Sequence, residues 1–154
     1  MTSNTESGSV LRFSMRTYEL NTKSWVQLLN TTSKLSSNTE MGSVLSNAAE
    51  TIPYDDEAVI DAFFDAANKF TSNTEHSRVL RSVISNPGFN KYVAYKVLES
   101  ARKISSSTEK ASVLIAISNT EMIKDPEIRK VYMNTAQTLS SDFEYRRVID
   151  SLVE

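Results

Sequence analysis

The sequence has no cysteine, a single histidine, and only three glycines and three prolines in 154 residues. The absence of cysteine excludes disulfide frameworks, cysteine-ligated zinc sites and thiol nucleophiles. The scarcity of glycine and proline disfavours an all-β or loop-rich chain and favours helix. No apolar run approaches the roughly 18 residues that a membrane span requires, and no signal-peptide pattern opens the chain. We therefore expect a soluble helical domain, and the sequence does not indicate its compartment.

Charge is unevenly distributed along the chain. The formal net charge is -2, and hydrophobic residues make up 40% of the sequence, enough for a substantial core. Residues 1–77 contain 10 acids and 5 bases, whereas residues 78–154 contain 9 acids and 12 bases. The first half is therefore acidic and the second half is basic.

A short polar phrase recurs at nearly constant spacing. The tetrapeptide Ser-Asn-Thr-Glu stands at residues 3–6, 37–40 and 72–75, and related tetrapeptides stand at 106–109 and 141–144. An aliphatic pair follows four and five residues after each glutamate. This pattern is typical of a capping box, in which the serine hydroxyl and the glutamate carboxylate each accept from an amide at the start of a helix. The expected capping residues are Ser3, Glu6, Ser37, Glu40, Ser72, Glu75, Ser106, Glu109, Ser141 and Glu144.

A second helix start recurs with the same period of 34 or 35 residues. Each start is an Asn or Asp, a residue type that favours the N-cap position, and apolar residues follow it at helical spacing. Breakers such as Pro53 and Asn86-Pro87-Gly88 fall where a turn between two helices is needed. An out-of-phase Ser-Asn-Thr-Glu at 118–121 is interpreted as part of the fourth turn. The four second starts are Asn21, Asp56, Asn90 and Asp125.

The two start signals predict an all-α fold built from a repeated helical hairpin. One hairpin cannot bury both of its apolar faces, whereas stacked hairpins bury them against each other. We expect a right-handed α-α superhelix, or solenoid, of about four 34–35-residue hairpins plus one terminal helix, forming a single domain over residues 1–154. The expected repeats are residues 3–36, 37–71, 72–105 and 106–140, followed by a half-repeat at 141–154.

Two stretches of the chain resemble a known kind of helical repeat. Residues 139–149 are similar to the pattern I-S-S-D-Y-E-x-x-x-V-L, and residues 125–136 are similar to D-P-E-L-R-x-x-Y-x-x-A. Across essentially its full length, the chain resembles bacterial HEAT-like helical-hairpin repeats. The tetratricopeptide signature is missing from every copy. The resemblance implies a HEAT-like solenoid of the kind attached to membrane-bound sensor or peptidase proteins, and it implies no catalytic or ligand-binding residue.

Several residues could suggest chemistry, but a structural explanation fits each of them. His76 lacks the partners that a metal site or a Ser/His/Asp triad requires. The acidic run at residues 55–57 lacks the glycine and the alternating spacing of a calcium loop, and acids at a helix start explain it. Trp25 could anchor a partner or lie partly buried in the first hairpin. We expect no catalytic residue, no metal site and no cofactor.

The predicted function is a non-enzymatic protein-binding or scaffolding module within a larger bacterial protein, because helical solenoids present an extended surface. A second hypothesis is head-to-tail self-association, in which the acidic half meets the basic half. A nucleic-acid-binding repeat is a weaker third hypothesis, because such repeats need a strong positive stripe. Candidate partner contacts vary between copies: Ser7, Met41, His76, Lys110 and Tyr145 follow each glutamate directly, and Arg12, Ser46, Arg81, Ile115 and Asp150 come six residues after it.

Overall fold

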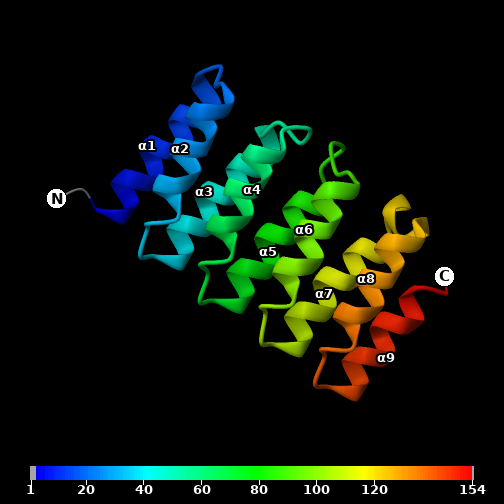
Figure 1. Ribbon diagram of the computed structural model, residues 1–154. Coiled ribbons are helices and arrows are strands. Elements are labelled where there is room, and N and C mark those ends of the chain that lie inside the picture. Colours follow the sequence, from blue (N-terminus) through cyan, green and yellow to red (C-terminus); the bar gives the residue numbers. More distant parts are fainter. Residues whose placement is uncertain (1–2, 154) are drawn as a thin grey trace.

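The computed structural model describes residues 3–153, and within this range the regular secondary structure is entirely helical. Within residues 3–153, nine α-helices and one short 3-10 helix follow one another (Figure 1). The expected all-α class is confirmed for this part of the chain. The elements are α1 (Asn4–Thr17), α2 (Thr22–Thr32), α3 (Asn38–Thr51), α4 (Glu57–Ala67), α5 (Asn73–Ile84), α6 (Lys91–Ala101), α7 (Ser107–Ser118), η1 (Glu121–Lys124), α8 (Pro126–Ala136) and α9 (Asp142–Ser151).

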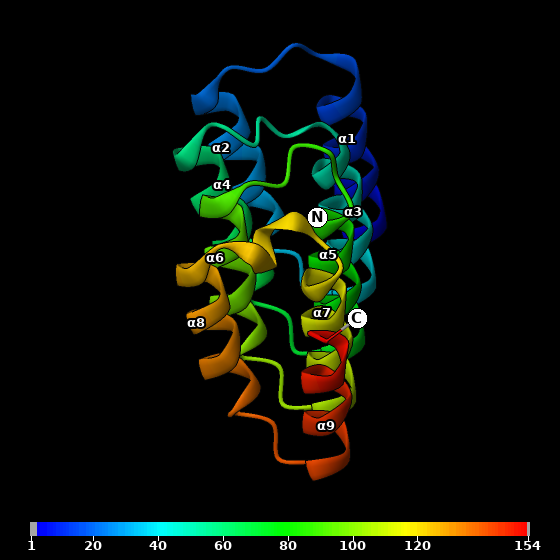
Figure 2. The same ribbon diagram turned by 90° about the vertical axis from the view of Figure 1, so that its right-hand side faces the viewer.

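The helices form two rows, with the odd-numbered helices in one row and the even-numbered helices in the other (Figure 2). Each helix packs mainly against the next but one in the chain, so α3 contacts both α1 and α5, and α4 contacts both α2 and α6. We call each odd–even hairpin a layer: α1–α2 is layer 1, α3–α4 layer 2, α5–α6 layer 3 and α7–α8 layer 4. The arrangement is consistent with a helical repeat, with α9 stacked on α7 at the far end from α1 (Figure 1).

The helices begin where the sequence predicts. In each odd-numbered helix, the N-cap serine Oγ accepts from the amide of the glutamate three residues later, at 3.1 to 3.3 Å. In the even row, the predicted Asn and Asp side chains accept from amides of the first helical turn. Each of these bonds satisfies an amide that would otherwise lack a partner at a helix start. The out-of-phase tetrapeptide at 118–121 runs from the last residue of α7 to the first residue of η1, in the expected connection between α7 and α8.

Burial at the two ends of the stack shows which way each repeat position faces. The first residue of the aliphatic pair is fully buried in α9 (Val148) but 63% exposed in α1 (Val10), so this position faces the preceding layer. In the even row, Tyr132 of α8 is fully buried, whereas its neighbour Met133 is half-buried. The position of Tyr132 therefore faces the preceding layer, and that of Met133 faces the following one. The core thus runs continuously from layer to layer.

Candidate functional site: the surfaces of the helical stack

The asparagine of the repeated phrase links each layer to the next. Oδ1 of Asn38 accepts from the backbone amides of Thr71 and Ser72, at 3.0 and 3.1 Å, and its Nδ2 donates to Oγ1 of Thr71 at 2.7 Å. These bonds join the start of α3 to the turn before α5, more than 30 residues away. Related bonds recur along the stack, from Asn4 to Ser36, from Asn73 to Ser105 and from Ser107 to Ser140.

We expect Asn38→Ala to lower the free energy of unfolding by about 1 to 2 kcal/mol, because two backbone amides lose a protein acceptor and one side-chain bond disappears. Urea unfolding followed by circular dichroism measures this loss. Asn38→Asp is the matched control, because it keeps the acceptor oxygen and places an acid in the first helical turn. Equal losses in the two variants would show that the bonds between layers do not stabilise the stack.

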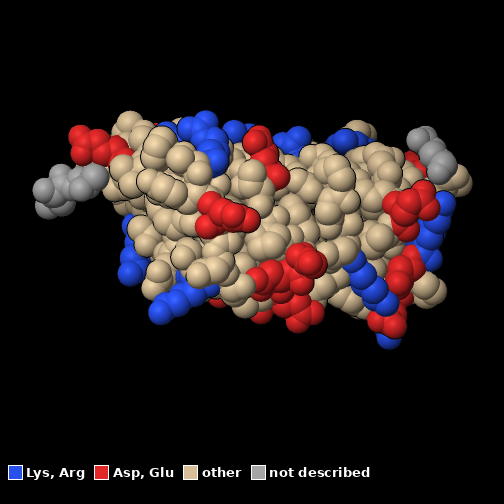
Figure 3. Space-filling model, turned by 90° about the horizontal axis from the view of Figure 1, so that it is seen from above, with Lys and Arg blue, Asp and Glu red and all other residues tan. Residues whose placement is uncertain are grey.

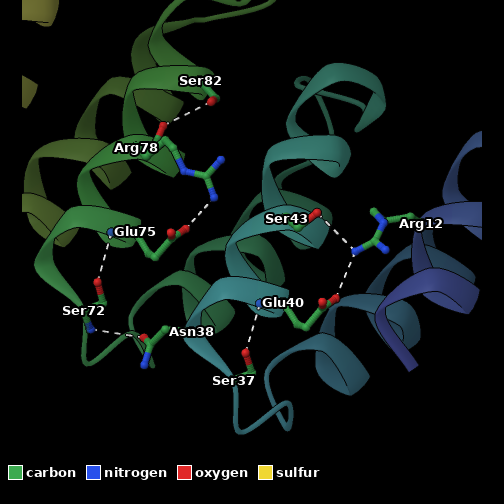
Figure 4. Close-up of polar contacts among 9 residues, drawn as sticks. All are labelled: Arg12, Ser37, Asn38, Glu40, Ser43, Ser72, Glu75, Arg78 and Ser82. Atoms are coloured by element: carbon green, nitrogen blue, oxygen red, sulfur yellow. Dashed lines mark hydrogen bonds and ion pairs between the residues drawn. The ribbon is translucent and has the colours of Figure 1, made fainter. Parts of the chain in front are cut away.

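The phrase glutamates Glu40 and Glu75 lie against the preceding layer and do not cap their own helices (Figure 4). Oε2 of Glu40 forms an ion pair with Nη1 of Arg12 in α1, at 3.2 Å. None of the hydrogen bonds within residues 3–153 joins a phrase glutamate carboxylate to its own N-cap amide, and the amide of Ser72 instead donates to Asn38. The prediction of a reciprocal capping box is therefore wrong in its second half. In α5, the N-cap amide already has an acceptor from the preceding layer, and the carboxylate of Glu75 pairs instead with Arg78.

A glycine in the preceding odd-numbered helix makes room for each of these two glutamates. A Cβ added to Gly8 would collide with the carboxylate of Glu40, and one added to Gly42 would collide with that of Glu75. The two glycines therefore leave room for these carboxylates between α1 and α3 and between α3 and α5. This position, two residues after the glutamate, is Gly8, Gly42, Ser77 and Ala111 in the first four copies and Arg146 in α9.

The predicted partner-contact residues differ in exposure: three are buried, five are half-buried and two are exposed. The side chains of Met41, His76 and Lys110 are buried, at 3%, 3% and 6% exposure. Nζ of Lys110 donates to Oγ1 of Thr138 at 2.9 Å, and burial lowers the pKa of this lysine. Arg12 is engaged by Glu40, as described above. Ser7, Ser46, Ile115 and Tyr145 are half-buried, and Arg81 and Asp150 are exposed.

His76 lies in a buried polar chain that runs from layer 3 to the end of α4 in layer 2. Its Nε2 is 2.7 Å from Oγ of Ser100, whose hydroxyl donates to Oδ1 of Asn68 at 2.6 Å. Because that hydroxyl proton is used by Asn68, we assign the proton between His76 and Ser100 to Nε2. Burial, and secondarily the charge of Lys103, lowers the pKa of His76 to about 4. The geometry brings a serine and a histidine together, but the hydroxyl proton points away from the imidazole that would have to accept it in nucleophilic catalysis.

The acidic run at residues 55–57 lies at the start of helix α4. Asp56 caps α4 by accepting from the amides of Ala58 and Val59, and Glu57 lies in the first turn. Asp61 forms an ion pair with Lys96 at 3.3 Å. Residues 3–153 contain no cluster of three or more His, Cys, Asp or Glu side chains arranged to hold a metal ion. Trp25 is buried at 5% exposure, so its ring belongs to the core of layer 1.

A polar groove crosses three layers at the ends of the even-numbered helices. Its volume is about 520 Å³. Two exposed lysines and one exposed aspartate contribute charge to it. Asn68, which accepts the hydrogen bond from Ser100 in the buried chain of His76, also lines this groove. The lining residues are Asn30 and Ser33 from layer 1, Asp65, Asn68 and Lys69 from layer 2, and Lys103 from layer 3.

The first layer exposes large apolar side chains that the sequence analysis did not single out. Val10, Phe13 and Tyr18 are 63%, 54% and 60% exposed. The rings of Phe13 and Tyr18 meet edge to face, with centroids 6.3 Å apart. The signal was present in the sequence, because the residue seven after the glutamate is aromatic only in the first copy. The equivalents of Phe13 are Asn47, Ser82, Ala116 and Ser151.

Comparisons with protein-family models, with curated proteins and with solved structures give no match for this chain. The resemblance to bacterial HEAT-like repeats therefore stays a prediction, and the repeated packing of alternate helices is what the structure supports. Among the helices of residues 3–153, none combines the length and the apolar character needed to cross a bilayer.

Proposed function

We propose that this protein is a non-enzymatic scaffolding module, a right-handed HEAT-like solenoid within a larger bacterial protein, that holds an extended acidic segment of a partner protein. The observation that carries the proposal is the polar groove, because its walls come from three successive layers. A surface assembled from equivalent positions of stacked repeats suits a partner that runs along the stack.

The charges of the groove favour an acidic segment over a basic one. Lys69 and Lys103 supply two cationic ends, and Asp65 supplies one carboxylate. Lysines near helix C-termini also interact favourably with the helix dipole, so they contribute to stability without a partner. Their exposed ammonium groups remain available to carboxylates of a bound peptide.

Nucleic acid is a weaker candidate partner. Figure 3 shows Lys and Arg side chains interspersed with Asp and Glu on the face that it presents, without a continuous positive band. Binding to a phosphate backbone relies on several cationic side chains along one track.

A labelled oligo-glutamate peptide serves as the probe for the groove. We expect the double variant Lys69→Glu, Lys103→Glu to bind this peptide about tenfold or more weakly than the unmodified chain, because two attractive contacts become repulsive. Fluorescence anisotropy at low and at high salt measures the dissociation constant. The control variant Lys23→Glu, Lys130→Glu has the same net charge change at exposed lysines outside the groove. If both variants weaken binding equally, net charge and not the groove binds the peptide, and the proposal fails.

A further inference from the structure

One face of α1 is uncovered and has the residue spacing of a helix-packing face. Glu6, Val10, Phe13 and Thr17 follow one another at intervals of four, three and four residues, and all four side chains are exposed. Residues at such intervals lie on one side of a helix. We call these four residues the α1 outer face. Its centre is apolar, with an acid at one end.

The apolar character of the α1 outer face is specific to the first copy. At the position of Val10, every other copy has a valine that is fully buried, because another odd-numbered helix packs on it. At the position of Phe13, every other copy has a small or polar residue. Two grooves, of about 280 and 250 Å³, lie beside this face and are lined in part by Tyr18, Leu28 and Thr31. A partner could therefore bury Val10 and Phe13 and place its own side chains in these grooves.

We propose that the α1 outer face binds the same face of a second copy, with the two α1 helices antiparallel about a two-fold axis near Val10. Helix α1 has its acid, Glu6, in the first turn and its base, Arg16, in the last turn. Antiparallel pairing places Glu6 of each copy within one helical turn of Arg16 of the other, so two ion pairs form. Such a contact is self-complementary and closes as a dimer. This inference does not depend on the scaffolding function.

The far end of the stack is a poorer match for the same face. In the contact between α1 and α3, Glu40 lies over Gly8 and pairs with Arg12. The residues of α9 equivalent to Gly8 and Arg12 are Arg146 and Asp150. A head-to-tail contact of α9 with α1 would therefore bring a large side chain to the small position and an aspartate toward Glu6. This geometry favours the two-fold contact between first layers over head-to-tail stacking.

Sedimentation velocity of the 154-residue chain over a range of concentrations tests the proposal. We expect a reversible dimer, and Phe13→Ser should weaken dimerisation by about tenfold or more, since an aromatic at the centre of an interface carries much of its binding free energy. Phe143→Ser, at a phenylalanine 70% exposed on α9, is the matched control and should have no effect. Glu6→Arg and Arg16→Glu should each weaken the dimer, and the double exchange should restore it.

Cross-linking locates the axis directly, because the chain has no cysteine of its own. Val10→Cys should form a disulfide-linked dimer under mild oxidation, much faster than Phe143→Cys at the same concentration. Circular dichroism verifies that each variant keeps its helical content. A chain that stays monomeric at every concentration overturns the proposal. So does a dimer that Phe143→Ser disrupts and Phe13→Ser leaves intact, because that result would place the contact at α9.

Discussion

Acid lowers the free energy of unfolding of this protein, and replacing His76 with methionine is expected to remove about 3 kcal/mol of that loss. The pKa of His76 is about 4 in the folded chain, against an ordinary value near 6.5, and each unit of difference corresponds to roughly 1.4 kcal/mol. The unfolded chain binds the proton at a higher pH than the folded chain does. The contribution of the neutral, buried imidazole is therefore fully present above pH 6.5 and is lost as the pH falls toward 4.

Methionine is a suitable replacement because Met41 already occupies the equivalent position of the preceding copy, at 3% exposure. At pH 7.5, His76→Met should lower stability by about 1 kcal/mol at most, through the lost hydrogen bond to Ser100. Near pH 4.5 the order should reverse, with the variant more stable than the unmodified protein.

Urea unfolding at intervals between pH 7.5 and 4 measures the difference between the two proteins. Carboxylates that titrate in this range affect both proteins alike, so they cancel in the comparison. A difference that stays constant across the range would mean that the folded protein admits a protonated His76 without cost, and the assignment of a neutral buried imidazole would be wrong.

The sequence was sufficient to place the helices because their start signals are local. A serine, asparagine or aspartate and the amide that it binds lie two or three residues apart, so the spacing alone predicts the bond. Local spacing could not predict which groups the glutamate side chains contact. The partner of Glu40 is Arg12, 28 residues earlier, and Gly8 leaves room for the carboxylate of Glu40.

The candidate contact residues show why variation between copies is a poor guide to exposure. Met41, His76 and Lys110 differ in chemistry, yet each is buried. His76 packs with Ser100, and Lys110 reaches Thr138, so each pairs with a residue of its own layer. The residue at this position therefore varies because it packs against different side chains in each layer. A comparison of the residues seven after each glutamate does detect the α1 outer face, because Phe13 is large and apolar where the other copies have small or polar residues.

Phe63→Ala is expected to cost about 3 to 5 kcal/mol of the free energy of unfolding, the range for removing a fully buried phenylalanine side chain. Phe63 stands seven residues after the N-cap of α4 and is fully buried. The same position in α8 is Tyr132, whose burial shows that it faces the preceding layer. The substitution therefore opens a cavity between layers 1 and 2. Since each layer is stabilised mainly by its neighbours, α1 and α2 should lose their coupling to the rest of the stack.

Leu28→Ala is the matched control, at the equivalent position of layer 1. Leu28 is half-buried and faces the side of α2 that no described helix covers, so its loss should cost roughly 1 kcal/mol. Guanidinium unfolding gives the two losses, and hydrogen exchange shows where they act. We expect Phe63→Ala to raise exchange in α1 and α2 before the later helices open. Two results would contradict this expectation: an equal loss of unfolding free energy in the two variants, or a uniform rise of exchange along the chain. Either result would mean that the layers are not stabilised mainly by their neighbours and that residues 3–153 unfold as one cooperative unit.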